Sequence, residues 1–191
     1  MILIGLGANL PHPEYGAPEA TLTRALQVLE DRGIGCQALS RWYVSPPWPP
    51  TLASQPWYVN AVAALETGLS PAALLTTMHE VEWSFGRVRM ERWAPRRIDL
   101  DLLAYHDRVC DGTGAHGDPV LPHPRMDRRA FVLMPLRDVA PDWRHPRTGT
   151  GLEEMLASTG DQGVQVMPEV WHGTPDRDVA EKALAGAASP R

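Results

Sequence analysis

The stretch RWAPRRIDLDLLAY, residues 92–105, places arginines and aspartates within a run that is otherwise apolar. Side chains alternate between the two faces of a strand, and we expect a strand over residues 96–105. One face would carry only apolar side chains: Ile98, Leu100 and Leu102. The other would carry polar ones: Arg97, Asp99 and Asp101. The apolar row predicts the face that packs on the core, and the two acids need a separate explanation.

Two carboxylates at this spacing lie about 7 Å apart and repel by roughly 2 kcal/mol at an effective dielectric constant of about 20. A divalent cation such as Mg2+ would relieve this repulsion, because it takes oxygen ligands and is commonly held by one or two carboxylates plus substrate phosphates. The alternative is a solvated face on which Arg97 pairs with the acids, an exposed ion pair worth about 0–1 kcal/mol. For the Asp-Leu-Asp pattern alone, the solvated face is the better interpretation.

Basic residues near the aspartates in the sequence change that weighting. Four arginines lie in or beside one stretch that leads into the strand: Arg87, Arg89, Arg92 and Arg96. A second polar segment carries three more basic or titratable residues: His123, Arg128 and Arg129. Guanidinium groups bind phosphate oxygens in a bidentate manner, so the set favours a polyphosphate ligand beside a metal site. A solvated loop on an acidic protein is the alternative for any one arginine.

The hydrophobic pattern predicts an α+β fold. Strands are expected over four ranges: 2–8, 35–44, 57–67 and 96–105. Helices are expected over three: about 18–32, 71–85 with Ser70 as the N-cap, and 151–158. Residues 45–56, which are rich in proline, and residues 86–95 are expected as long loops. The order β-α-β-β-α-β implies helices packed on a mostly antiparallel sheet.

Length and composition limit the class of protein. We expect a single domain over residues 1–170 of the 191, followed by a peripheral or mobile tail over residues 171–191. The formal net charge of −5 provides no basic field for nucleic acid, and no stretch approaches the roughly 20 apolar residues of a membrane span. Cys36 and Cys110 belong to no paired or metal-binding pattern, which favours a reducing cytoplasm. Because Lys182 is the only lysine, P-loop and protein-kinase sites are excluded.

Four motifs, in this order, resemble one known family. They are GLGANL (5–10), SPPW…QPWYVNAVAALET (45–67), EVEWSFGRVRMERWAPRRIDLDLL (80–103) and LPHPRMDRRAFVLMPLRDVAP (121–141). Over about residues 1–146 the chain resembles the 6-hydroxymethyl-7,8-dihydropterin pyrophosphokinases, enzymes of folate synthesis. The resemblance implies a ferredoxin-like, three-layer α-β-α fold with a mostly antiparallel sheet and long active-site loops. It also implies a monomer that transfers pyrophosphate from ATP to the pterin hydroxymethyl group, with AMP leaving.

The resemblance further implies roles for individual residues. Asp99 and Asp101 would bind two Mg2+ ions. The other catalytic residues would be Arg87 and Arg96, on the transferred and leaving phosphates. ATP would be held by Arg89, Arg92, Trp93, His123 and Arg129, with Trp93 in a lid. The pterin ring would be stacked and hydrogen-bonded by Tyr58, Phe131 and Asn60, with the backbone around Ser45 and Pro46 completing the pocket.

The chain departs from the family pattern at three positions. Ala8 stands where serine is usual, Ser45 where threonine is common and Ala94 where glycine is usual. None of these removes a charged group, but they leave open a second hypothesis, a catalytically weak pterin- or nucleotide-binding protein on the same fold. A third hypothesis, a glycosyltransferase that uses the aspartates on a nucleotide sugar, is disfavoured because such enzymes usually have a doubly wound nucleotide domain.

Overall fold

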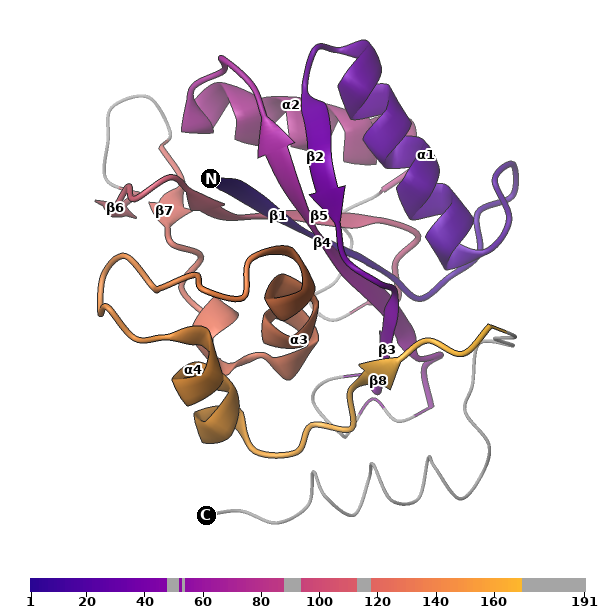
Figure 1. Ribbon diagram of the computed structural model, residues 1–191. Coiled ribbons are helices and arrows are strands. Elements are labelled where there is room, and N and C mark those ends of the chain that lie inside the picture. The colour runs from indigo at the N-terminus through magenta and orange to yellow at the C-terminus, as the bar shows by residue number, and fades with distance from the viewer. Residues whose placement is uncertain (48–51, 53, 88–93, 113–117, 170–191) are drawn as a thin grey trace.

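The structure is a computed structural model of the 191-residue chain, and it describes residues 1–47, 52, 54–87, 94–112 and 118–169. The fold has three layers (Figure 1). Helices α1 (Pro18–Asp31) and α2 (Pro71–Ser84) cover one face of the main sheet, and α3 (Ala130–Val139) and α4 (Leu152–Thr159) lie against the other. The predicted ferredoxin-like α-β-α arrangement is confirmed.

Within the described residues the main sheet has six strands: β1 (Ile2–Ala8), β2 (Gly35–Leu39), β3 (Tyr43–Ser45), β4 (Tyr58–Glu66), β5 (Asp99–Tyr105) and β8 (Gln165–Val166). Their order is β5-β1-β4-β3-β8, with β2 also paired to β4. Every pairing among these strands is antiparallel, which confirms the predicted, mostly antiparallel sheet. A separate hairpin joins β6 (Cys110–Asp111) to β7 (Val120–Leu121), and a short 3-10 helix, η2 (Met126–Arg128), precedes α3.

Local signals explain where the two long helices begin and end. Pro18 and Pro71 occupy the first turns of α1 and α2, where a missing N–H costs nothing. The backbone N–H of Ala73 donates to Ser70 Oγ over 3.3 Å, so the predicted N-cap of α2 is confirmed. Beyond the ends of both helices the chain turns at a glycine with positive φ, +79° at Gly33 and +74° at Gly86.

Strand β5 has the predicted alternation. Ile98, just before it, and Leu100 and Leu102 within it are no more than 4% exposed and pack in the core beneath α1 and α2. Asp99 and Asp101 lie half-buried on the opposite face. A second core covers part of that face, where Leu103 packs with residues of α3 and α4. The acids therefore lie beside a packed core and not on an open, solvated face.

One predicted strand is interrupted in the structure. The range 35–44 forms two strands, because the ladder breaks after Leu39 and resumes at Tyr43. Ser40 is 6% exposed at the break: its N–H donates to the Val62 carbonyl over 2.9 Å, and its Oγ accepts the Val62 N–H over 3.0 Å. A serine hydroxyl thus takes the place of a backbone carbonyl, and the hydrophobic pattern does not reveal this.

The sequence prediction does not include helix α3. Pro135 lies inside this helix, and proline lacks the N–H that continues a helix. Val132, Leu133 and Leu136 lie on one side at helical spacing and are at most 6% exposed against the sheet. Burial of this apolar stripe stabilises the helix despite the proline. Among the described residues, no helix is both long enough and apolar enough to cross a membrane.

Candidate active site

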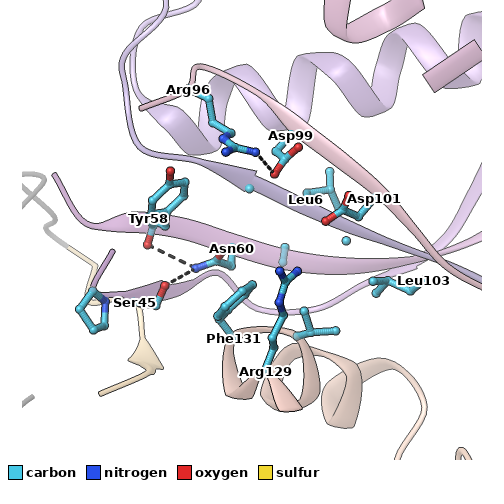
Figure 2. Close-up of a pocket in the computed structure, with 15 residues that line it drawn as sticks. Leu6, Ser45, Tyr58, Asn60, Arg96, Asp99, Asp101, Leu103, Arg129 and Phe131 are labelled. Carbon is cyan, nitrogen blue, oxygen red and sulfur yellow. Dashed lines mark hydrogen bonds and ion pairs between the residues drawn. The ribbon is translucent and has the colours of Figure 1, made fainter. Parts of the chain in front are cut away.

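A pocket lies on the face of the sheet that carries the acids, at the start of α3 (Figure 2). Its lining comes from β1, β3, β4, β5 and the first turn of α3, and includes Ser45, Pro46, Tyr58, Asn60, Arg96, Asp99, Asp101, Arg129 and Phe131. The pocket therefore gathers most of the predicted site residues that the structure describes. We call the part around Asp99 and Asp101 the carboxylate end, and the part around Ser45, Tyr58, Asn60 and Phe131 the aromatic end.

Two glycines of β1, Gly5 and Gly7, line the pocket. In the antiparallel register Gly7 is opposite Asp99 and Gly5 is opposite Asp101. A Cβ at Gly7 would lie 3.6 Å from Asn60 Oδ1 and 3.9 Å from Asp99 Cβ. Any side chain there would fill the gap between an acid of one end and the amide of the other. The glycines of the GLGANL motif thus shape the pocket.

Asp99 is the centre of the charge network at the carboxylate end. Its Oδ1 lies 2.7 Å from Arg87 Nη1, and its Oδ2 lies 2.7 Å from Arg96 Nη1. Burial, and next the negative charge of Asp101, raise the pKa of Asp99, while the two arginines oppose that rise. Arg97, which would pair with the acids in the alternative of a solvated face, is exposed and donates through Nε to the carbonyl of Pro11 over 3.3 Å.

Asp101 faces the same pocket as Asp99, but no salt bridge or hydrogen bond joins its carboxylate to another described residue. No group of three or more His, Cys, Asp or Glu side chains lies close enough to hold a metal within the described part of the chain. A complete protein cage for a metal is therefore absent from these residues. Two carboxylates on one face, one of them without an ion-pair or hydrogen-bond partner among the described residues, do fit the way Mg2+ is held together with substrate oxygens.

Glu82 is a residue of this site that the sequence prediction missed. It is 2% exposed on α2, its Oε1 accepts the Leu100 N–H over 2.7 Å, and the same oxygen pairs with Arg87. The signal for it was the helix period, because Glu82 follows Met78 by four residues and precedes Phe85 by three on the buried stripe. An acid at such a position needs a partner, and Arg87 provides one.

Asn9 is a second residue that the prediction missed. It is 2% exposed, its Oδ1 accepts the backbone N–H of Arg96 over 2.7 Å, and its Nδ2 donates to the carbonyl of Pro56 over 3.2 Å. Arg96 follows one predicted loop and Pro56 ends the other. One buried amide therefore fixes the ends of both segments beside the pocket.

Neutral polar groups at the aromatic end are satisfied by one another. Asn60 is 5% exposed, and its Nδ2 donates to Ser45 Oγ over 3.0 Å and lies 3.4 Å from the Tyr58 carbonyl. Ser45 pairs with Tyr58 in the ladder between β3 and β4, so the sheet register brings these groups together. Phe131 enters from α3, with Arg129 Cζ 5.4 Å from its ring centroid. The rings of Tyr58 and Phe131 both border the pocket (Figure 2).

Arg129 lines the pocket, and His123 lies near enough to Arg129 and Asp99 for their charges to affect its pKa. Burial, and next the positive charges of Arg129 and Arg125, lower the pKa of His123 to about 4, so its imidazole is neutral near pH 7. His123 Nδ1 accepts the N–H of Arg125 over 3.3 Å, which leaves the hydrogen on Nε2. Arg129 lines the pocket, whereas the side chain of Arg128 is 87% exposed beside Asp127.

Three predicted ATP-binding residues, Arg89, Arg92 and Trp93, lie outside the described residues. Arg87 and Arg96, which flank that segment, both contact Asp99. The remaining site predictions gather around one pocket. Paired carboxylates between arginines, next to an aromatic pocket with an amide at its edge, fit the site of an enzyme that transfers a phosphate group to a flat organic acceptor.

Comparison with known proteins identifies the family. A sequence model of the 7,8-dihydro-6-hydroxymethylpterin-pyrophosphokinase family matches residues 3–141, and the chain belongs to this family. It is a diphosphokinase. A 2-amino-4-hydroxy-6-hydroxymethyldihydropteridine pyrophosphokinase of Synechocystis is 38% identical over 154 residues, which are 81% of this chain and 73% of that protein. The enzyme of the same name from Pseudomonas aeruginosa is 40% identical over 167 residues, 87% of this chain and 96% of that protein.

A larger fungal protein contains a similar region. The folic acid synthesis protein fol1 of Pneumocystis carinii is 32% identical over 168 residues, which are 87% of this chain but only 21% of that protein. The chain therefore matches almost the full length of a bacterial enzyme and about a fifth of the fungal one.

Proposed function

We propose that this chain transfers the β,γ-pyrophosphoryl group of ATP to the hydroxymethyl oxygen of 6-hydroxymethyl-7,8-dihydropterin, in folate synthesis. The pterin oxygen forms a bond to the β phosphorus, the bond from that phosphorus to the bridging oxygen of the α-phosphate breaks, the hydroxyl proton is lost, and AMP leaves. The observation that carries the proposal is that Asp101 and Asn60 line one pocket. A nucleotide phosphate chain at the carboxylate end would thus lie next to an acceptor at the aromatic end.

Asp99 and Asp101 are the proposed ligands of two Mg2+ ions, bound together with the oxygens of ATP. Bound Mg2+ would neutralise phosphate charge and align the acceptor oxygen with the phosphorus. Support comes from the lack of a partner for Asp101 among the described residues and from the pKa of Asp99, which burial and Asp101 raise. A cation between the two acids would favour the ionised form of both.

Arg87 and Arg96 are the proposed partners of the transferred and leaving phosphates. Both side chains are no more than 25% exposed, and charged hydrogen bonds in a partly desolvated site are stronger than those in water. Arg129 and neutral His123 are proposed to hold other parts of ATP from the α3 side. Arg89, Arg92 and Trp93 keep the ATP-binding and lid roles that the family resemblance implies.

The aromatic end is the proposed pterin site. Tyr58 and Phe131 would stack on the faces of the ring, while Asn60 would hydrogen-bond its edge with a group that can both donate and accept. Ser45 and Pro46 would border the ring through their backbone. Since Asn60 is already held by Ser45, its amide would need little reorganisation when the ring binds.

The wider predictions remain proposals as well. We propose one catalytic domain over residues 1–170, a peripheral role for residues 171–191, a monomer, and a cytoplasmic location. Support comes from hydrophobic cores that pack on both faces of one sheet and from two cysteines that form no disulfide.

The direct test measures AMP released from MgATP, with and without 6-hydroxymethyl-7,8-dihydropterin, for the wild type and for Asp101→Ala. The wild type should release AMP only when the pterin is present, and the variant should be slower by about 10³-fold or more. Pterin binding by the folded wild type with no AMP formed would contradict the proposal. That outcome would favour the catalytically weak binding protein.

A further inference from the structure

Helix α2 buries an acid next to the carboxylate end. The side chain of Glu82 is only 2% exposed, and the helix places it beside Met78, Val81 and Phe85 on the stripe that faces the core. A carboxylate taken out of water costs several kcal/mol unless charged or hydrogen-bonding partners compensate. The partners of Glu82 therefore decide what the acid does.

Both partners of Glu82 lie next to residues of the active site. Its Oε1 accepts the N–H of Leu100, which lies between the two aspartates of β5, over 2.7 Å. The same oxygen pairs with Arg87, whose Nη1 also lies 2.7 Å from Asp99 Oδ1. One guanidinium group is thus shared between a fully buried acid and an acid of the pocket.

The two arginines that contact Asp99 differ in the number of acids with which they pair. Arg87 pairs with Asp99 and with Glu82, whereas the ion pair of Arg96 with a described acid is made to Asp99. Their side chains are similarly buried, 19% exposed for Arg87 and 25% for Arg96. Loss of the contact with Asp99 would therefore leave Arg87 paired and Arg96 without its acid.

We propose that Glu82 is a positioning residue that keeps Arg87 in place when Asp99 turns to a bound divalent cation. This inference rests on the proposed function, since it assumes that Asp99 ligates the metal. Both oxygens of Asp99 are taken up by arginines, so binding a cation requires at least one of these contacts to be given up. Glu82 makes the exchange easier on the Arg87 side, because Arg87 keeps one acid after it leaves Asp99, whereas Arg96 keeps no ion pair with a described acid.

Replacement of Glu82 by glutamine tests this with little change of shape. The glutamine amide keeps an oxygen for the Leu100 N–H but has no charge, so Arg87 would pair with Asp99 alone and hold it more firmly. Mn2+ should therefore bind about tenfold more weakly to Glu82→Gln than to the wild type, with α,β-methylene-ATP present, as measured by the electron paramagnetic resonance signal of free Mn2+. Glu80→Gln is the matched control, because Glu80 lies on the same helix and pairs on the surface with Arg32.

A double-mutant cycle separates the proposed role from simple support of β5. If Glu82 acts through Arg87, Glu82→Gln should change Mn2+ affinity less than about threefold when Arg87 is already alanine. The proposal would be overturned if Glu82→Gln weakened Mn2+ binding equally in both backgrounds, or bound Mn2+ as the wild type does.

A second pair of variants keeps the test valid if Glu82→Gln does not fold. Arg87→Gln would leave a buried acid unpaired and should lower the melting temperature clearly more than Arg96→Gln, since Asp99 would still have Arg87. Equal melting temperatures for these two variants would overturn the proposal. None of these measurements needs turnover, so a wild type that binds Mn2+ as expected but forms no AMP would contradict the proposed function alone.

Discussion

The two ends of the pocket meet the demands of burial in different ways. At the aromatic end, neutral groups satisfy each other within the sheet, as Asn60 and Ser45 do over 3.0 Å. At the carboxylate end, charged groups are balanced against each other: Asp99 lies between Arg87 and Arg96, and Asp101 has no described partner. The aromatic end is thus ready for a neutral ligand as it stands. The carboxylate end must exchange its partners when charged ligands bind.

After Asp101→Ala, the next largest expected effect tests the carboxylate end alone. Arg96→Ala should lower kcat for AMP formation by about 10²–10³-fold, because it removes a positive charge beside the transferring phosphates. Pterin affinity, measured by calorimetry, should stay within about threefold of the wild type. Arg97→Ala is the matched control, since Arg97 is the next residue but is exposed. Equal losses in the two variants would show that position in the pocket does not matter.

The next effect tests the aromatic end alone. Asn60→Ala should weaken pterin binding by about 10–100-fold, because a buried amide that hydrogen-bonds a ligand edge is worth about 1.4–2.8 kcal/mol. Its affinity for α,β-methylene-ATP with Mg2+ should not change. If the variant lost affinity for both ligands, the result would contradict the claim that the two ends bind their ligands separately.

A smaller effect is expected for aromatic stacking. Phe131→Leu should weaken pterin binding by about 3–10-fold, since an aromatic pair contributes about 0.5–1.5 kcal/mol beyond its buried area. Phe85→Leu is a useful comparison, because Phe85 is buried at the end of α2 and packs near Tyr15 and His12. That variant should lose stability in thermal unfolding and keep its pterin affinity. If Phe85→Leu weakened pterin binding and Phe131→Leu did not, Phe131 would not be the residue that stacks on the pterin.

The smallest effect concerns His123 and pH. Its pKa falls from an ordinary 6.5 to about 4 in the folded protein. As the pH is lowered, His123 is therefore protonated in the unfolded chain at a higher pH than in the folded protein. The stability that this residue contributes is complete above about pH 6.5 and is lost as the pH falls toward 4. Between about pH 7.5 and 6 the loss should be about 1 kcal/mol, and His123→Gln should remove it. Parallel curves of unfolding free energy against pH for the two proteins would contradict this.

Much of the carboxylate end could be predicted from the sequence, because it depends on local patterns. The period of two along residues 98–102 fixes which face of β5 carries the acids, and the packing of α1 and α2 against the apolar row confirms it. The arginines near the strand could be expected close to the acids for the same reason. The ion-pair partners of the acids could not be predicted in this way. Arg97 is the arginine on the same strand face, whereas Arg87 and Arg96 contact Asp99.

Contacts between distant segments account for what the sequence did not reveal. Asn9 forms hydrogen bonds with Arg96 and Pro56, which lie 87 and 47 positions away in the sequence. No local pattern indicates such pairs. Glu82 reads as one more polar residue of a helix unless its place on the buried stripe is noticed. Helix α3 forms around Pro135 because tertiary burial outweighs helix propensity.

The central claim is that one pocket holds two ligands at separable ends. Isothermal titration calorimetry of Asp101→Ala and Asn60→Ala, each with 6-hydroxymethyl-7,8-dihydropterin and with α,β-methylene-ATP plus Mg2+, tests it most directly. The account predicts that Asp101→Ala loses nucleotide binding and keeps pterin binding, and that Asn60→Ala does the opposite. If both variants lost the same ligand, or if neither lost any affinity, the assignment of the two ends would be wrong.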